Sequence, residues 1–299
     1  MPAAKKVLAV CVNWNGRKVL PATLSSLANS HYPALEVMVV DNASEDGSVK
    51  LVPDSTRLLV LPRNSGYGAG LNAAVHPYVE ATGRLPDAHP DFFLFLNNDI
   101  VLEPDLIDRL VRFAEDKDPA IYGPKILLQQ KPSRLDAAWG RLTWSHVLAR
   151  YRGKQAPDAP RWNRVRRVEL LLGCLLLVHH RVLERVGLWD ESFFMYHEEV
   201  DFLFRARNAG FPAYYCPFVR AFHQGAHSTR DQPLRKTYWL RRNTVYFFRK
   251  HRAGVAQWLH FALTLLASLA YNLLSFRWKR AGAISRGCLD GFGMVIHHD

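Results

Sequence analysis

The feature that most constrains the fold of this chain is an alternation of short apolar runs and polar turns. Within the first hundred residues, four runs rich in Val, Leu and Phe are separated by stretches whose apolar residues recur with helical spacing. Strands that alternate with helices through short polar turns predict an α/β fold built on a mostly parallel, doubly wound, Rossmann-like sheet. The predicted strands are Val7–Val12, Leu35–Val40, Leu58–Leu61 and Phe92–Leu96.

A cluster of Asn, Asp, Ser or Gly follows each predicted strand directly. In parallel sheets, ligands bind beyond the carboxyl ends of the strands, and all four clusters belong to that edge. Turns favour the same residues, so one cluster alone would say little, but four in succession predict a binding site. The clusters are Asn13-Trp14-Asn15-Gly16, Asp41-Asn42-Ala43-Ser44, Arg63-Asn64-Ser65-Gly66 and Asn97-Asn98-Asp99.

The second half of the chain has a different pattern. Val168–Val178 is an apolar run that contains Gly173, and Glu198–Asn208 carries apolar residues in helical register. Gly210 is placed to end that helix. Acids in the first turn of a helix stabilise it through the helix dipole, so Glu198-Glu199 alone does not require a catalytic role.

Cysteine usage and the N-terminal segment indicate a reducing compartment. The four cysteines lie far apart and form no Cys-x-x-Cys pair, which argues against a disulfide framework or a zinc site. The first fifteen residues lack the long apolar core of a signal peptide. We therefore expect a cytoplasmic location. The cysteines are Cys11, Cys174, Cys216 and Cys288.

Positive charge is concentrated near the C-terminus. The formal net charge is +12, and the segment from Arg235 to Arg286 holds eleven Lys and Arg residues without one Asp or Glu. Such a segment suits an anionic surface, which phospholipid headgroups, nucleic acid or a phosphorylated substrate would offer. Residues 232–299 are expected to form a basic and apolar helical appendage.

An uncharged stretch of 24 residues, Ala253–Phe276, lies inside this appendage. Its length would allow a membrane span. However, Gln257, His260 and Asn272 interrupt it, and basic residues flank both of its ends. Basic flanks around an apolar face predict a helix that lies in the membrane interface. A helix buried against the main domain is the alternative.

Six motifs, taken in their order and spacing, resemble the family 2 glycosyltransferases of the GT-A superfamily. The nearest branch is the bacterial rhamnosyltransferase type, which builds cell-envelope polysaccharides. Each motif is weak alone. The resemblance implies a GT-A domain over residues 1–231, with a nucleotide-binding half at about 1–105 and an acceptor half at about 106–231. The motifs are Val12–Gly16, Val39–Ser44, Arg63–Asn72, Phe95–Asp105, Gly187–Phe211 and His223–Ser228.

The resemblance implies a nucleotide-sugar donor that is dTDP- or UDP-linked. Asp41 would accept a hydrogen bond from the imide N–H of the base, a charge-assisted contact that favours uracil or thymine. A simple turn-forming role is the alternative for Asp41. Glycines in Arg63–Asn72 would let the backbone approach the donor. The other donor-binding candidates are Asn13, Trp14, Asn15, Asn42, Asn64, Gly66, Asn72, Asn97 and Asn98.

The family carries an Asp-x-Asp-type motif whose last Asp holds a divalent cation that bridges the donor diphosphate. This chain has Asn97-Asn98-Asp99 at the matching place, so only the last acid is present. The resemblance implies that Asp99 is a ligand of Mg²⁺ or Mn²⁺ and that His223 is a second ligand. A structural histidine at a strand end is the alternative for His223, and His227 is a weaker candidate.

The catalytic base of the family lies in a Glu-Asp-x-Asp motif, which here reads Glu198-Glu199-Val200-Asp201. The matching position implies that Glu199 deprotonates the acceptor hydroxyl in an inverting transfer. Glu is one methylene longer than Asp, so Glu198 could share or take this role. The pair Asp201–Arg205, at i and i+4, is expected to support the helix. The resemblance places Trp189, Asp190 and Glu191 on the acceptor side.

The resemblance thus implies a metal-dependent, inverting hexosyltransferase, with rhamnose as a candidate sugar. Its acceptor would be a glycan or a polyprenyl-diphosphate-linked sugar at the cytoplasmic face of the inner membrane. Two other classes stay open. A nucleotidyltransferase would need a basic loop after the first strand, where this chain has Asn-Trp-Asn-Gly. A non-catalytic protein would bind anionic surfaces through the appendage, but Arg235–Arg252 has no nucleic-acid motif, so no nucleic-acid partner is expected.

Overall fold

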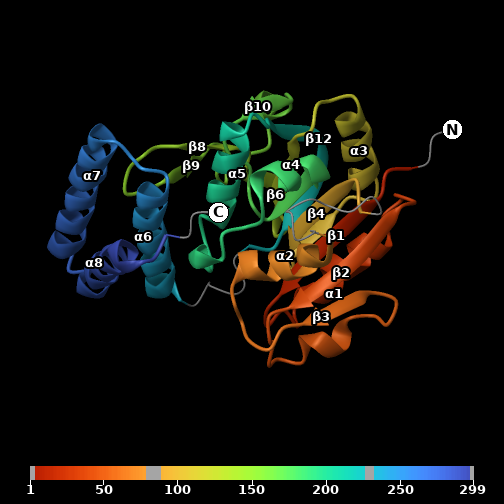
Figure 1. Cartoon of the computed structure of the whole chain (residues 1–299), viewed down its shortest axis with the longest axis horizontal. Coiled ribbons are helices and arrows are strands. Elements are labelled where there is room, and N and C mark those ends of the chain that lie inside the picture. Colours follow the sequence, from red (N-terminus) through yellow and green to blue (C-terminus); the bar gives the residue numbers. More distant parts are fainter. Residues whose placement is uncertain (1–3, 79–88, 226–231, 297–299) are drawn as a thin grey trace.

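The computed structural model describes residues 4–78, 89–225 and 232–296. A ten-stranded sheet forms the centre of the molecule, helices cover both of its faces, and a group of C-terminal helices stands beside it (Figure 1). The four predicted runs form β1 (Val7–Asn13), β2 (Leu35–Asp41), β3 (Arg57–Val60) and β4 (Phe92–Asn97), each within one residue of its predicted ends. All four are parallel, with β1 between β2 and β4.

The second half adds strands in both directions. They are β5 (Ile100–Leu102), β6 (Ile121–Leu128), β7 (Lys131–Ala137), β10 (Arg166–Val168), β11 (Leu175–His179) and β12 (Ala213–His223). β11 is inserted antiparallel between β4 and β6, whereas β12 is parallel to β6. The strand order is β10-β12-β6-β11-β4-β1-β2-β3, with β5 on β12 and β7 on β6. A separate pair consists of β8 (Gly140–Leu142) and β9 (Ala149–Tyr151).

Helices pack on both faces of the sheet, as predicted for a doubly wound fold. α1 (Leu20–Ala28) and α3 (Leu106–Glu115) bury their leucines in the core on one face. α2 (Tyr67–Val75), α4 (His180–Val186) and α5 (Glu198–Asn208) contribute to the core on the other face. Short 3₁₀ turns, η1 (Ser48–Leu51), η2 (His76–Tyr78), η3 (Pro160–Trp162) and η4 (Glu191–Phe193), lie in connections. The predicted α/β class, with helices on both faces of the sheet, is confirmed.

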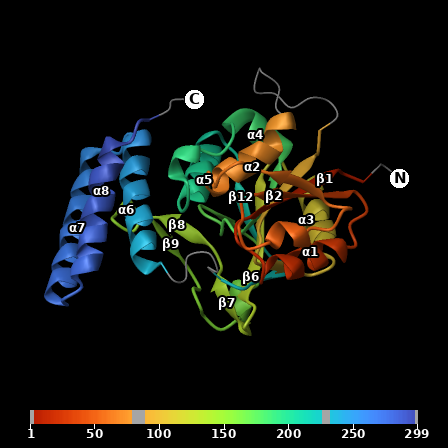
Figure 2. The same cartoon turned by 90° about the horizontal axis from the view of Figure 1, so that it is seen from below.

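Three long helices, α6 (Pro233–Lys250), α7 (Val255–Leu274) and α8 (Trp278–Gly293), stand side by side (Figure 2). α6 belongs to the same core as α2, α4 and α5, and its residues 245–248 are fully buried there. α8 approaches α6 closely at Gly287, where a Cβ would lie 2.5 Å from the carbonyl oxygen of Tyr238. The hydrophobic core thus continues across the domain boundary predicted near residue 232.

α7 is packed on one side only. Trp258 and Phe261 contact Phe248 of α6. None of the helices in the described ranges is long and apolar enough to cross a membrane. On the opposite side of α7, apolar side chains recur with helical spacing and are 41–81% exposed. We call this surface the α7 stripe; it consists of Val255, Leu259, Leu263, Leu266, Leu273, Leu274 and the following Phe276.

Candidate active site

The polar clusters after β1, β2 and β4 lie together at the carboxyl edge of the sheet. The fully buried Asn13 side chain joins them. Its Nδ2 donates to Asp41 Oδ1 (2.7 Å) and to Ser48 Oγ (2.9 Å). Its Oδ1 accepts from Asn98 Nδ2 (2.7 Å). Three of the predicted site residues thus form one hydrogen-bonded unit.

Asp41 is 1% exposed, and the chain itself uses most of its acceptor capacity. Oδ1 accepts from Asn13 and from Ser44 Oγ (2.7 Å), whereas Oδ2 accepts only from the Ser44 amide (2.8 Å) among the described residues. Oδ2 therefore has room for one further donor. Recognition of the donor nucleobase by Asp41 stays a prediction, and Oδ2 is the oxygen that is left to accept its hydrogen bond. Beside this unit, Trp14 is half-buried and Asn15 is exposed.

Gly66 brings the end of β3 against the loop that precedes α5. Its φ is +98°, and a Cβ would collide with the carbonyl oxygen of Phe194, so glycine is required here. Asn42 Nδ2 donates to the Gly66 carbonyl oxygen (3.0 Å), and Asn64 Oδ1 accepts from the Gly66 amide (3.0 Å). These contacts shape the chain itself. The donor-binding roles of Asn42, Asn64 and Gly66 stay predictions.

Asn72 and Trp189 are packed inside the chain. Asn72 Nδ2 donates to the Trp189 carbonyl oxygen (2.8 Å) and to Glu191 Oε1 (2.9 Å), and its Oδ1 accepts from the Trp189 amide (3.0 Å). Trp189 is 3% exposed and stacks on Phe202 with ring centroids 4.5 Å apart. These two predicted site residues therefore hold the turn that carries the exposed Glu191.

Asp99 and His223 meet where β5 pairs with β12, because Ile100 lies opposite His223 in that register. Asp99 Oδ1 and His223 Nε2 are 3.2 Å apart. Both atoms are buried, and apart from this contact with each other neither has a hydrogen-bond partner among the described residues. Two ligands that are each about 2.1 Å from one divalent ion lie about 3 Å apart. The pair therefore fits the predicted metal site.

Asp136 of β7 supports this pair and was not predicted from the sequence. His223 Nδ1 donates to Asp136 Oδ2 (2.7 Å), which turns Nε2 towards Asp99. A carboxylate behind a metal-binding histidine fixes its tautomer. Burial alone lowers the pKa of His223, but the hydrogen bonds and charges of Asp136 and Asp99 raise that pKa to about 10. No local pattern marks Asp136, because it lies 87 residues from His223.

Glu198 and Glu199 begin α5 as a buried pair of carboxyl groups. Glu199 Oε1 accepts from the Tyr151 hydroxyl (3.1 Å), and a Cβ at Gly173 would lie 2.7 Å from the Glu199 Cβ. Glu198 is 8% exposed, and its Oε2 has no hydrogen-bond partner in the described ranges. Burial raises the pKa of both groups, and the charge of Glu199 raises the pKa of Glu198 further. A carboxylate of raised pKa is a better proton acceptor.

The turn Gly173-Cys174 lies between the glutamate pair and the end of β4. Gly173 touches Glu199, and the Cys174 carbonyl oxygen accepts from the Asn97 amide at the end of β4 (3.0 Å). Burial raises the pKa of the Cys174 thiol, and the charges of Asp99 and Glu199 add to that effect. The metal-ligand candidates and the glutamate pair therefore flank the same short turn.

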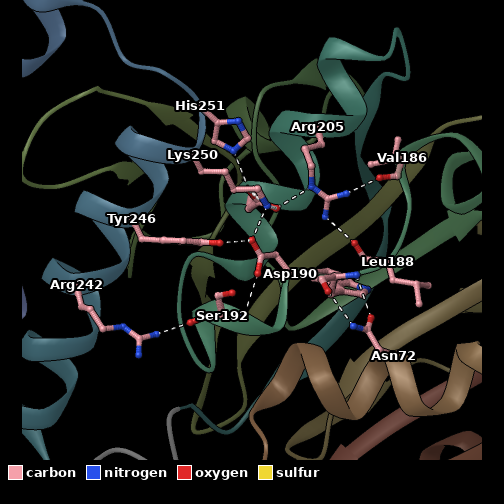
Figure 3. Close-up of polar contacts among 12 residues, drawn as sticks. Asn72, Val186, Leu188, Asp190, Ser192, Arg205, Arg242, Tyr246, Lys250 and His251 are labelled. Atoms are coloured by element: carbon pink, nitrogen blue, oxygen red, sulfur yellow. Dashed lines mark hydrogen bonds and ion pairs between the residues drawn. The ribbon is translucent and has the colours of Figure 1, made fainter. Parts of the chain in front are cut away.

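Asp190 lies in a buried ion network between α5 and α6 (Figure 3). Lys250 Nζ is 2.6 Å from Asp190 Oδ2 and 3.0 Å from Asp201 Oδ1. The predicted Asp201–Arg205 pair is present at 2.8 Å, and His251 Nε2 also lies 2.8 Å from Asp201. Burial opposes ionisation of Asp201, but these partners hold its pKa below the ordinary value. Asp190 is thus tied to the helix framework, and its predicted acceptor contact stays a prediction.

The loop before α5 has a strained backbone. Phe194, Tyr196 and His197 adopt φ angles of 60°, 68° and 70°. Such left-handed conformations cost about 1–3 kcal/mol each when the residue is not glycine. The fully buried Asn243 of α6 offsets this cost, because its Nδ2 lies 2.6–2.9 Å from three carbonyl oxygens of the loop. A single Asn within an aromatic helix gives no functional pattern, so the sequence did not reveal it.

Comparison with known proteins shows that this chain is similar to sugar-transferring enzymes. A family model described as glycosyl transferase family 2 matches residues 9–173. Over 268 residues, the chain is 27% identical to N-acetylglucosaminyl-diphospho-decaprenol L-rhamnosyltransferase of Mycobacterium tuberculosis, which covers 82% of this chain and 84% of the relative. Over 193 residues it is 26% identical to rhamnosyltransferase WbbL of Escherichia coli K12, covering 62% of this chain and 71% of the relative.

Two solved structures share the fold. A mannosyltransferase from Pyrobaculum calidifontis, in complex with GDP-Man and Mn²⁺, superimposes with a TM-score of 0.58 at 15% identity, covering 97% of this chain and 88% of that one. GalNAc-T7 with UDP, GalNAc and Mn²⁺ gives a TM-score of 0.60 at 15% identity, covering 83% of this chain and 48% of that one. At these identities the likeness concerns the fold alone.

Proposed function

The chain belongs to glycosyl transferase family 2, and from this membership we propose that it transfers a hexose from a nucleotide diphosphate to a hydroxyl group of an acceptor glycan. Rhamnose is the candidate sugar favoured by the named relatives. The observation that carries the proposal is the buried contact between Asp99 Oδ1 and His223 Nε2, which flanks the same short turn as the glutamates of α5. A cation site and a base are the groups that sugar transfer from a diphosphate requires.

Glu199 acts as the general base in this proposal. Its carboxylate takes the proton of the acceptor hydroxyl as that oxygen bonds to the anomeric carbon. The bond from this carbon to the diphosphate breaks, and its electron pair stays on the phosphate oxygen. Attack from the side opposite the leaving group inverts the anomeric configuration. Tyr151 donates to Oε1 and thereby orients the carboxylate, which leaves Oε2 for the proton.

A divalent cation held by Asp99 and His223 would neutralise charge on the departing diphosphate. Asp136 keeps His223 in the orientation that this role needs. The imidazole nitrogen favours Mn²⁺ over Mg²⁺. The donor base, uracil or thymine, would donate its imide N–H to Asp41 Oδ2.

The proposed acceptor is a sugar on a polyprenyl diphosphate, because the mycobacterial relative is named for such a substrate. The test supplies the purified chain with dTDP-rhamnose, UDP-glucose, UDP-N-acetylglucosamine or GDP-mannose. N-acetylglucosaminyl diphosphate on a short prenyl chain serves as the acceptor, with Mn²⁺, Mg²⁺ or EDTA. We expect one donor to be consumed with metal, and NMR to show one added hexose of inverted configuration. Release of sugar 1-phosphate, with the nucleoside monophosphate transferred to the acceptor, would instead identify a nucleotidyltransferase.

We also propose that the α7 stripe rests on the cytoplasmic face of the inner membrane, so that the protein is peripheral there. The stripe is apolar and exposed, and Arg277, Lys279 and Arg280 follow it directly. Apolar side chains and basic residues add their affinities for an anionic lipid surface.

The full-length protein is expected to sediment with vesicles that contain anionic lipid and to be released by high salt. Each buried leucine contributes about 1.5–3 kcal/mol, so the double variant Leu263→Glu, Leu266→Glu should bind at least about a hundredfold more weakly. Leu58→Glu, Val60→Glu on β3 is the matched control, since these apolar side chains are exposed at the far edge of the sheet. Equal sedimentation of all three proteins would contradict the proposal.

A further inference from the structure

A cavity of about 390 Å³ lies between the carboxyl edge of the sheet and the start of α6. Trp14 and Asn64, which follow β1 and β3, form one side of it. The first two turns of α6 form the other side. The cavity adjoins the proposed donor pocket, because both share Trp14 and Asn64. Its lining residues are Trp14, Asn64, Phe194, Met195, Gln232, Arg235, Lys236 and Trp239.

Arg235 and Lys236 bring two positive charges to this cavity without acidic partners among the described residues. The Arg235 guanidinium donates to the neutral Gln232 side chain (3.2 Å). The Lys236 ammonium lies 5.2 Å from the ring centroid of Tyr196. Elsewhere on the same helix, Lys250 is paired with two carboxylates. Two cations left unneutralised in a concave site favour an anionic ligand.

Lys236 is half-buried at the wall of the cavity. Burial lowers the pKa of this ammonium group, Lys154 adds to the effect, and the charge of Asp136 opposes it.

The aromatic wall of the cavity is partly occupied and partly free. Trp239 is stacked on Phe194, with centroids 5.0 Å apart, and the Arg242 guanidinium lies 4.2 Å from the Trp239 ring centroid. Trp14 has no ring or cation contact in the described ranges and is half-buried. One indole face is therefore available to a sugar ring, beside cations that suit a phosphate.

The exposed aromatic residues at the end of the α7 stripe and the start of α8 lie towards the end of α6 that lines the cavity. α6 and α8 run in the same direction, since Gly287 contacts Tyr238 and Gly291 contacts Arg242. Trp278, at the start of α8, therefore lies at the level of the start of α6. Phe276 and Trp278 are 81% and 59% exposed there.

We propose that this cavity binds the diphosphate of a lipid-linked acceptor, with Arg235 and Lys236 contacting the phosphate oxygens. The inference rests on the proposed function and names the residues that select its acceptor. The donor diphosphate is assigned to Asp99 and His223, whereas the lipid chain of the acceptor would extend from the cavity towards the exposed Phe276 and Trp278.

The test compares three probes by isothermal titration calorimetry with the full chain. They are N-acetylglucosaminyl diphosphate on a ten-carbon prenyl chain, the decyl glycoside of N-acetylglucosamine, and the nucleotides UDP and dTDP. The variant Arg235→Ala, Lys236→Ala should bind the diphosphate acceptor about 10–100-fold more weakly, because two charge-assisted contacts are lost. Affinity for the phosphate-free glycoside and the nucleotides should stay within about twofold. Lys236→Arg should retain most of the wild-type affinity.

Arg181→Ala, Arg185→Ala is the matched control, since it removes two exposed charges from α4. If this control weakens binding of the diphosphate acceptor equally, the loss is caused by the change in net charge alone, and the inference is overturned. Equal loss of nucleotide affinity in the α6 variant would assign the cations to the donor. Unchanged affinity for every probe would show that the cavity binds no phosphate. Sugar transfer by the wild-type protein tests the proposed function separately. If the wild type transfers sugar, the outcomes above contradict only the inference about the cavity. If it transfers none, the proposed function is itself wrong.

Discussion

Glu199→Gln is expected to leave donor affinity within about twofold of wild type and to reduce kcat by about 10²–10⁴-fold, the usual cost of losing a general base. Gln is nearly isosteric and can still accept the hydrogen bond from Tyr151, so the fold of the cleft is retained. Only the ability to take a proton disappears. Donor affinity from calorimetry and kcat from product formation measure the two effects separately.

Glu198→Gln is the matched control for this substitution. We expect it to keep most of the activity. Burial raises the pKa of Glu199, and the base must be deprotonated, so kcat of wild type should fall as the pH decreases through a value above the ordinary 4.5. Burial of Glu199 itself is the main cause of its raised pKa, and Glu198→Gln keeps that burial. The acid limb of the pH profile should therefore hardly move in Glu198→Gln. An inactive Glu198→Gln beside an active Glu199→Gln would assign the base to Glu198.

Asp99→Ala is expected to abolish metal-dependent turnover, with a loss of about 10³-fold, because stabilisation of the leaving diphosphate contributes several kcal/mol. The variant removes one of two ligand atoms that lie 3.2 Å apart. Binding of Mn²⁺, followed by electron paramagnetic resonance without substrate, should be lost as well. This readout does not depend on catalysis.

Asp136→Asn should weaken Mn²⁺ binding less than Asp99→Ala does. Its side chain does not reach the ion in this proposal, but it orients His223, so Mn²⁺ affinity should fall by about 10–100-fold while the fold is kept. The assignment is wrong if Asp99→Ala binds Mn²⁺ like wild type, or if EDTA leaves the activity of the wild-type protein unchanged.

The parallel half of the sheet was predictable because its signals are local. Each strand from β1 to β4 is one apolar run followed by a turn cluster, and the observed ends differ from the predicted ones by one residue. The mixed half was not predictable in the same way. β11 enters antiparallel between β4 and β6, a choice made by pairing with distant strands. The core shared by α6 and the sheet helices depends on such distant packing too.

The residues of the candidate site also fall into a group with a local sequence signal and a group recognisable only from distant contacts. Asp99 and His223 were found through a family motif, and the fold brings their side chains together. The same motif approach could not separate residues that face the cleft from residues that build its walls, as Trp189 illustrates. Asp136 and Asn243 were missed because each is an isolated polar residue, recognisable only by the distant group that it contacts.

The position of Lys250 between two buried carboxylates restricts which single substitutions the protein can tolerate at these three positions. Losing one partner of a buried ion pair costs about 3–5 kcal/mol, which is a large part of the stability of an ordinary domain. A neutral residue at position 250 would leave Asp190 and Asp201 without their shared cation. We therefore expect Asp190, Asp201 and Lys250 to change together in related sequences. A sequence that loses the lysine should have lost both carboxylates as well.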